Sequence, residues 1–273
     1  MTHFSSMPNH RNQMIKSLLK NNKTREFGSG VECSIMVKNA RLDLSQLRAY
    51  NRYFGFSDNI IPLPFWFVFS QPAQLALFNH TSFPTSVLGL VHLGLTIERI
   101  NMGSLDADYH LGVDLIQTKS TTRGLLIKVK IVIQNEKETI AVIESDYLSP
   151  NKNTTKRRVE KKADRFDCTD ARMVEYNVAK ARKYAKLSGD YNPIHLHSLL
   201  SRLFGFRQPI LHGMYSVASL YAYCYKRNLG SDKQMRVKFK RPLLLPQTAY
   251  ILQMDTRGYL LNSDAKCCVE MVW

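Results

Sequence analysis

The sequence lacks the features that mark several common protein classes. Its five cysteines are scattered, and no pair has the C-x-x-C spacing of a zinc or redox site. We therefore expect reduced thiols, no metal site and a cytoplasmic location. The most apolar stretch, residues 59–78, contains Pro62, Pro64 and Pro72, so it predicts buried core and not a membrane span. The N-terminus has no apolar core of a secretory signal.

Acidic residues are also scarce. The chain has 38 Lys and Arg residues against 22 Asp and Glu residues, which gives a formal net charge of +16. Such a charge is compatible with nucleic acid, an anionic membrane, or acidic ligands such as phosphorylated cofactors and carrier proteins. The sequence shows neither a nucleic-acid-binding motif nor a basic patch interleaved with aromatic residues. We therefore expect no nucleic-acid partner.

The order of apolar segments predicts two similar units. In each half of the chain a buried helix, at about 64–83 and 212–228, precedes a run of antiparallel strands. In one predicted strand Ile127, Val129 and Ile131 alternate with Lys128 and Lys130, as in a sheet with one buried face. The pattern predicts an α+β fold with two copies of a helix wrapped by a sheet.

A basic segment that is nearly free of large apolar residues separates the two halves. It is either a solvated linker or loop, or a basic arm near an anionic partner. We expect an N-terminal extension at residues 1–30 and a first unit at 31–150. A basic linker or loop at 151–166 would then lead to a second unit at 167–273.

The stretch YAKLSGDYNPIH, residues 184–195, predicts a rigid bend between two helices. Gly189 permits a turn conformation, and Pro193 forces Asn192 out of helical geometry. Asp190 and His195 on either side of the bend can converge on one water molecule, as general acid/base catalysis requires. The alternative is that Asp190 and Asn192 only cap the bend and the next helix.

The second informative stretch is HGM, residues 212–214, at the start of the long apolar helix. A helix N-terminus has unsatisfied backbone N–H groups, and Gly213 lets a substrate carbonyl approach them closely. These groups could stabilise the oxygen of a thioester as it becomes enolate-like. Alternatively, Gly213 permits close packing of the helix on the sheet.

These stretches resemble a known family. YAKLSGDYNPIH, GFRQPILHGM (205–214) and VKFKRPLLLP (237–246) are similar, in order and spacing, to segments of the MaoC-like dehydratases, or (R)-specific enoyl-CoA hydratases. The resemblance covers about residues 170–255. It implies a hotdog fold, and the first half, which has no D-x-N-P-x-H motif, resembles a degenerate first unit of a double hotdog. That unit would shape the acyl pocket.

The resemblance implies a hydro-lyase that adds water to trans-2-enoyl thioesters to give (R)-3-hydroxyacyl thioesters, or runs the reverse dehydration. Asp190 and His195 would be the catalytic dyad and Gly213 the oxyanion donor. Supporting positions would be Ser188, Asn192 and His212. Two alternatives stay open: an acyl-carrier-protein-dependent dehydratase of fatty-acid or polyketide synthesis, and a non-catalytic hotdog protein that binds acyl thioesters.

The implied substrate carries coenzyme A or phosphopantetheine, and no separate cofactor is expected. Lys238 and Lys240 share one face of a predicted strand and are candidate phosphate contacts, although solvated surface charge is the alternative role. Because a double hotdog can satisfy its own interface, we expect a monomer or a homodimer.

Overall fold

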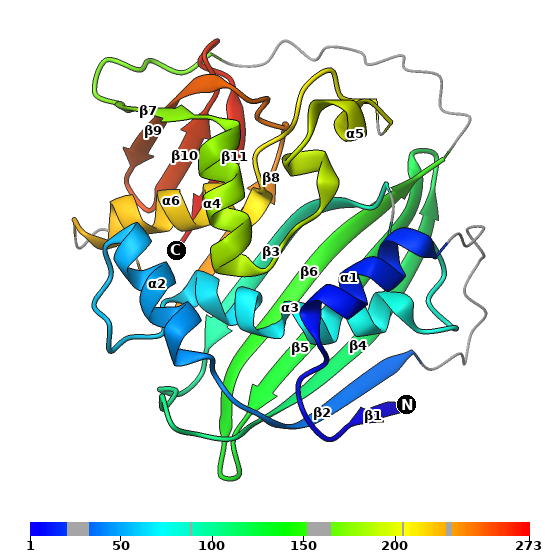
Figure 1. Cartoon of the computed structure of the whole chain (residues 1–273). Helices are drawn as coiled ribbons and strands as arrows, with labels where there is room; N and C mark the ends of the chain where they lie inside the picture. The colour runs from blue at the N-terminus through cyan, green and yellow to red at the C-terminus, as the bar shows by residue number, and fades with distance from the viewer. Residues whose placement is uncertain (21–32, 88, 152–164, 204, 228–230) are drawn as a thin grey trace. The chain divides into compact units, whose positions relative to one another are not determined.

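The computed structural model describes residues 1–20, 33–87, 89–151, 165–203, 205–227 and 231–273 (Figure 1). The chain divides into two compact units. Unit 1 comprises Met1–Leu47 and Phe65–Arg157, and unit 2 comprises Arg48–Pro64 and Arg158–Trp273. One boundary between the units lies inside helix α2 (Leu44–Phe54). Each unit is described separately below.

The sheet of unit 1 has the strand order β1-β2-β4-β5-β6-β3. β1 pairs with β2 in parallel, and the other neighbours are antiparallel. Residues on β5 alternate between buried and partly exposed, which confirms the predicted alternation. The strands are β1 (Thr2–Phe4), β2 (Ser34–Ala40), β3 (Val91–Arg99), β4 (Tyr109–Thr121), β5 (Gly124–Gln134) and β6 (Thr139–Pro150).

Helix α3 (Leu63–Asn79) lies against this sheet (Figure 1). Aromatic side chains make the contact between them. Trp66 lies edge-on to Tyr109 of β4, with ring centroids 5.5 Å apart. Phe78 meets Tyr147 of β6 in the same way at 5.3 Å. α3 shows almost no polar face, as is typical of a helix buried on all sides. A shorter helix, α1 (His10–Leu19), hydrogen-bonds to the end of α3 through Asn79.

Unit 2 has an antiparallel sheet with the order β8-β11-β10-β9-β7. The long helix α6 (Gly213–Tyr225) contacts β9, β10 and β11 and is mostly buried. Helix α4 (Val178–Ser188), the 3-10 turn η1 (Pro193–His195) and helix α5 (Ser198–Leu203) precede α6. The strands are β7 (Arg172–Tyr176), β8 (Gln234–Phe239), β9 (Gln247–Met254), β10 (Arg257–Leu261) and β11 (Cys267–Val272).

Residues 48–64 complete the core of unit 2 although they come from the first half of the sequence. Phe54 lies 5.9 Å from Tyr215 of α6 and 6.2 Å from Tyr184 of α4, measured between ring centroids. Tyr53 and Tyr215 are joined through their hydroxyl groups. Aromatic pairs contribute stability beyond that of the apolar area they bury. This segment therefore stabilises helices α4 and α6.

The predicted α+β class is confirmed: each unit has a long helix against an antiparallel sheet. Two details differ from the sequence prediction. Residues 259–273 are apolar enough at both ends to predict a single last strand, but they form two strands, because residues 262–266 form a turn in which Ala265 has a positive φ. β2 and α2 are not predicted from the sequence, because their apolar residues form only short, weakly periodic patterns.

The predicted N-terminal extension contains β1 and α1, and the predicted domain boundaries stay a prediction. Most of the basic segment 151–166 lies outside the described residues. No helix in the described parts of the chain is long and apolar enough to cross a bilayer.

We predict that Phe54→Ala lowers the free energy of unfolding by about 3–5 kcal/mol, because it leaves a cavity between α4 and α6. Urea denaturation followed by circular dichroism measures the change. Met173→Ala, at a side chain that is 64% exposed, is the control and should change little. Equal midpoints for the Phe54→Ala variant and the unmodified chain would contradict the packing described for residues 48–64.

Candidate active site

The bend after α4 is fixed by backbone geometry. Gly189 ends α4 in the left-handed conformation, with φ of 79°, and its N–H donates to the carbonyl of Ala185. A residue with a side chain adopts this conformation at a cost, which explains glycine here. Asn192 and Pro193 then begin η1, as the sequence predicts from the restriction that proline places on its neighbour.

Asp190 is held at the bend by two hydrogen bonds. Its backbone N–H donates to Ser188 Oγ at 3.2 Å, and its Oδ1 accepts from the backbone N–H of Asn192 at 3.1 Å. The side chain is partly buried. These two contacts orient the carboxylate within the turn.

His195 is buried and has one defined tautomer. Its Nδ1 lies 2.8 Å from the carbonyl oxygen of Ile210, and because a carbonyl only accepts, Nδ1 carries the hydrogen in the neutral ring. Nε2 is then the acceptor nitrogen. Burial lowers the pKa of His195, while the Asp190 charge and the Ile210 carbonyl oppose this shift. The ring is thus a neutral base near pH 7.

A second imidazole, that of His212, lies against the first. The two rings are stacked with centroids 3.9 Å apart. His212 Nε2 lies 3.0 Å from the backbone carbonyl oxygen of Asp190 and donates to it. Burial, followed by the neighbouring His195, lowers the pKa of His212 to about 3. His212 therefore stays neutral and connects the bend to the start of α6.

Asp190, His195 and His212 form one cluster, in which one donor atom from each lies within 4.8 Å of the others. Two neutral imidazoles and a carboxylate can exchange protons with a bound molecule. They are also donor types that Zn²⁺ accepts, although the spacing of cysteine and histidine in the sequence predicts no metal site.

Gly213 is the first residue of α6, and His212 at the N-cap makes no side-chain capping hydrogen bond. The first backbone N–H groups of α6 therefore start one residue after the ring that contacts Asp190 and His195. A Cβ atom on Gly213 would lie 3.0 Å from the ring of Phe239. This close approach supports the packing role of Gly213 and is compatible with its role as a donor.

The predicted supporting residues contact the bend in different ways. Ser188 is buried and accepts from the Asp190 N–H. The amide oxygen of Asn192 accepts from the N–H of Ile194 and caps η1. Asn192 thus has the capping role that the sequence allows. Asn192 contacts Asp190 through its backbone N–H, which donates to Oδ1 of Asp190.

Comparison with known proteins gives the family of this region. Residues 150–256 match the family model described as MaoC like domain. This part of the chain is therefore similar to MaoC-like domains. The 3-hydroxyacyl-thioester dehydratase X of Mycobacterium tuberculosis is 24% identical to this chain over 227 residues, which are 81% of each protein. The predicted family resemblance is confirmed.

Solved structures support the fold. A crystal structure of HtdX from Mycobacterium tuberculosis has a TM-score of 0.75 and 23% identity, and the match covers 87% of this chain and 98% of that one. A Mycobacterium tuberculosis protein described as having a double hotdog fold matches with a TM-score of 0.54 and 11% identity over 92% of this chain and 94% of its own. The prediction of two hotdog units is confirmed at the level of fold.

The two predicted phosphate contacts lie beside Glu270 of β11. Lys240 Nζ is 2.6 Å from Glu270 Oε2, and Lys238 faces Glu270 across the strand pair. The hydrogen bond from Lys240 lowers the pKa of Glu270. A phosphate at Lys240 would compete with this ion pair, so the alternative of surface charge is better supported for Lys240.

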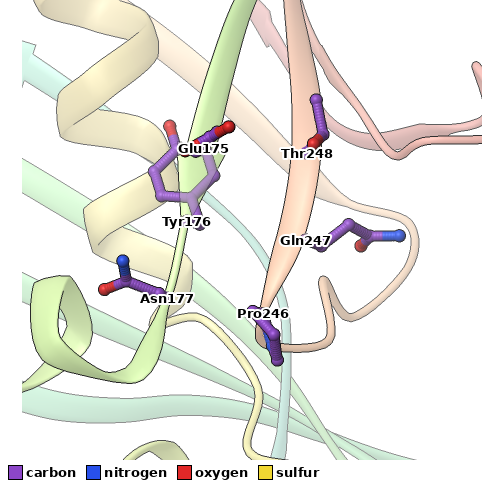
Figure 2. Close-up of a pocket in the computed structure, with 6 residues that line it drawn as sticks. All are labelled: Glu175, Tyr176, Asn177, Pro246, Gln247 and Thr248. Carbon is purple, nitrogen blue, oxygen red and sulfur yellow. The ribbon is translucent and has the colours of Figure 1, made fainter.

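A separate cavity of about 310 Å³ lies where β7 ends and β9 begins (Figure 2). Its lining combines one carboxylate with amide, hydroxyl and apolar groups, from Glu175, Tyr176, Asn177, Pro246, Gln247 and Thr248. Asp190, His195 and Gly213 do not line this cavity, and its lining contains no histidine. The cluster of Asp190, His195 and His212 is therefore the candidate active site.

We predict that unit 2 loses stability in acid because His212 is buried as a neutral ring. A histidine titrates near 6.5 when unfolded, whereas the folded pKa of His212 is about 3. Below pH 6.5 the unfolded chain binds a proton that the folded chain does not, so stability falls toward pH 3. The slope is about 1.4 kcal/mol per pH unit for one histidine.

Urea denaturation between pH 7 and pH 5 measures this slope. His212→Asn should reduce the slope, whatever its effect on stability at pH 7. His197→Asn, at an exposed histidine two residues beyond His195, is the matched control. An unchanged slope in the His212→Asn variant would mean that the ring is not buried in the neutral form.

Proposed function

We propose that the MaoC-like domain catalyses the reversible hydration of trans-2-enoyl thioesters to (R)-3-hydroxyacyl thioesters. The observation that carries this proposal is the cluster of Asp190, His195 and His212 at the first turn of α6. The relative from Mycobacterium tuberculosis is named as a 3-hydroxyacyl-thioester dehydratase. Its name bears out the predicted enzyme class, a hydro-lyase.

Hydration places a hydroxyl group on C3 of the enoyl chain and a proton on C2. One group must take a proton from water, and one must deliver a proton to C2. His195 offers Nε2 as an acceptor because its Nδ1–H is donated to the Ile210 carbonyl. Asp190 offers a carboxylate oxygen beside it. The two groups act as a coupled pair in this proposal, with either able to hold the transferred proton.

The thioester oxygen gains negative charge as the nucleophile adds to C3. In the proposal this oxygen accepts a hydrogen bond from the backbone N–H of Gly213 at the positive end of α6. No redox step or external co-reactant is involved, so the reaction balances with water alone. The coenzyme A or phosphopantetheine group enters as part of the substrate.

We predict that Asp190→Asn and His195→Gln each lower kcat by about 10²–10⁴-fold, the usual contribution of a general acid or base. Loss of the absorbance of the conjugated thioester of crotonyl-CoA measures the rate, and chiral analysis of the product tests the (R) configuration. His197→Gln is the control and should retain activity. Equal rates in the unmodified chain and the Asp190→Asn variant would refute the dyad.

We predict that two variants separate the effect of the Gly213 N–H on kcat from the effect of added bulk at Gly213. Gly213→Ala adds a Cβ atom and keeps the N–H, whereas Gly213→Pro adds carbon atoms and removes the N–H. Proline is tolerated at the first position of a helix. The proline variant should lose about 10²–10³-fold more kcat than the alanine variant. Equal losses in the two variants would assign Gly213 to packing against Phe239 alone.

A further inference from the structure

The stretch of sequence that contains the proposed active site has almost no acidic residues. From Asn177 to Ser231 the sequence contains one acid, Asp190 itself. The basic residues in the same stretch are Lys180, Arg182, Lys183, Lys186, Arg202, Arg207, Lys226 and Arg227. These eight basic residues and one acid give the segment a net charge of +7, out of +16 for the whole chain.

Helix α5 begins three residues after His195 and exposes apolar side chains. Leu199 is 62% exposed and Leu200 is 39% exposed. Tyr191, in the bend itself, is 51% exposed. Isolated exposed apolar residues are common, but adjacent leucines on a short helix beside a reactive site are typical of a surface that another molecule covers.

Basic side chains accompany these leucines. Arg202 follows Leu199 by three positions on α5, so the two lie on one side of the helix. Arg182 of α4 donates to the backbone carbonyl of Leu196, directly after His195, at 3.3 Å. Arg207 is exposed in the connection from α5 to α6. Neither Arg202 nor Arg207 forms an ion pair with another residue in the described ranges.

We propose that this α5 face, made of Leu199, Leu200, Arg202 and Arg207 with Arg182 beside it, is the docking surface for an acidic acyl carrier protein. The carrier would present the enoyl or 3-hydroxyacyl chain on its phosphopantetheine arm to Asp190 and His195. This inference rests on the proposed function and specifies the carrier of its substrate.

Charge and exposed apolar area together favour a protein over free coenzyme A. The phosphates of coenzyme A could pair with arginines, but coenzyme A has no apolar protein surface to cover two leucines. An acidic carrier supplies both contacts: carboxylates for the arginines, and apolar side chains for Leu199 and Leu200. Charge complementarity of this kind mainly increases the association rate and is weakened by salt.

The experiment compares three substrates with one acyl group: crotonyl-acyl carrier protein, crotonyl-CoA and crotonyl-N-acetylcysteamine. The full-length chain is assayed unmodified, as Leu199→Ser/Leu200→Ser and as Arg202→Glu/Arg207→Glu. The control combines Lys233→Glu with Met254→Ser, at exposed residues before β8 and at the end of β9. Binding of the unacylated holo-carrier is measured separately by isothermal titration calorimetry.

Each docking variant should raise KM for the carrier substrate roughly tenfold or more, because interface charges and apolar anchors act on association and residence. Turnover of the N-acetylcysteamine thioester, which has no carrier to dock, should stay within about twofold. The arginine variant should also remove the salt dependence of carrier binding, and the control variant should match the unmodified chain.

Equal losses on all three thioesters, or carrier binding that is unaffected by either docking variant, would overturn the inference. A shift of the full-length chain from dimer to monomer in the leucine variant, with carrier binding retained, would identify a second copy of the chain as the occupant and also overturn it. Absence of turnover with every thioester, together with carrier binding that the arginine variant abolishes, would support the docking surface and refute the proposed hydratase activity.

Discussion

The geometry of the candidate site depends on two imidazole N–H groups that are donated to backbone carbonyls. His195 donates to Ile210, and His212 donates to Asp190. Each bond fixes a tautomer and a ring orientation, and together they hold the bend, the segment before α6 and the start of α6 in one arrangement. Because both rings are buried, a break in either bond would leave an unpaired polar group at a cost of about 1–3 kcal/mol.

In the bend, a residue to which we assign a catalytic role also makes a turn hydrogen bond. Asp190 closes a turn through Oδ1, and Asn192 caps η1 through its amide oxygen. The sequence presents these as alternatives, since each pattern is common in proteins without activity. In the structure the caps restrict the motion of Asp190 and His195, which is what proton transfer to a bound substrate requires. Local stability and the proposed chemistry therefore depend on the same hydrogen bonds.

Much of the fold could be predicted from the sequence because its signals are local. The period of two in β5, the uninterrupted apolar character of α3 and α6, and the Gly-Asp-x-Asn-Pro bend each follow from neighbouring residues. The stacking of His212 on His195 could not be predicted in this way, because the two residues are brought together by the segment between η1 and α6. The pairing of Lys240 with Glu270 likewise depends on the register of β8 with β11.

The placement of residues 48–64 means that unit 2 cannot be cut out of the chain as one continuous segment. These residues lie far outside the 150–256 match to the family, yet Phe54 and Phe56 are buried against Tyr184, Tyr215 and Tyr221 of unit 2. The second hotdog is therefore not a continuous piece of the gene. A recombination event or an engineered fusion that cut the chain near residue 150 would separate helix α6 from part of the core that surrounds it.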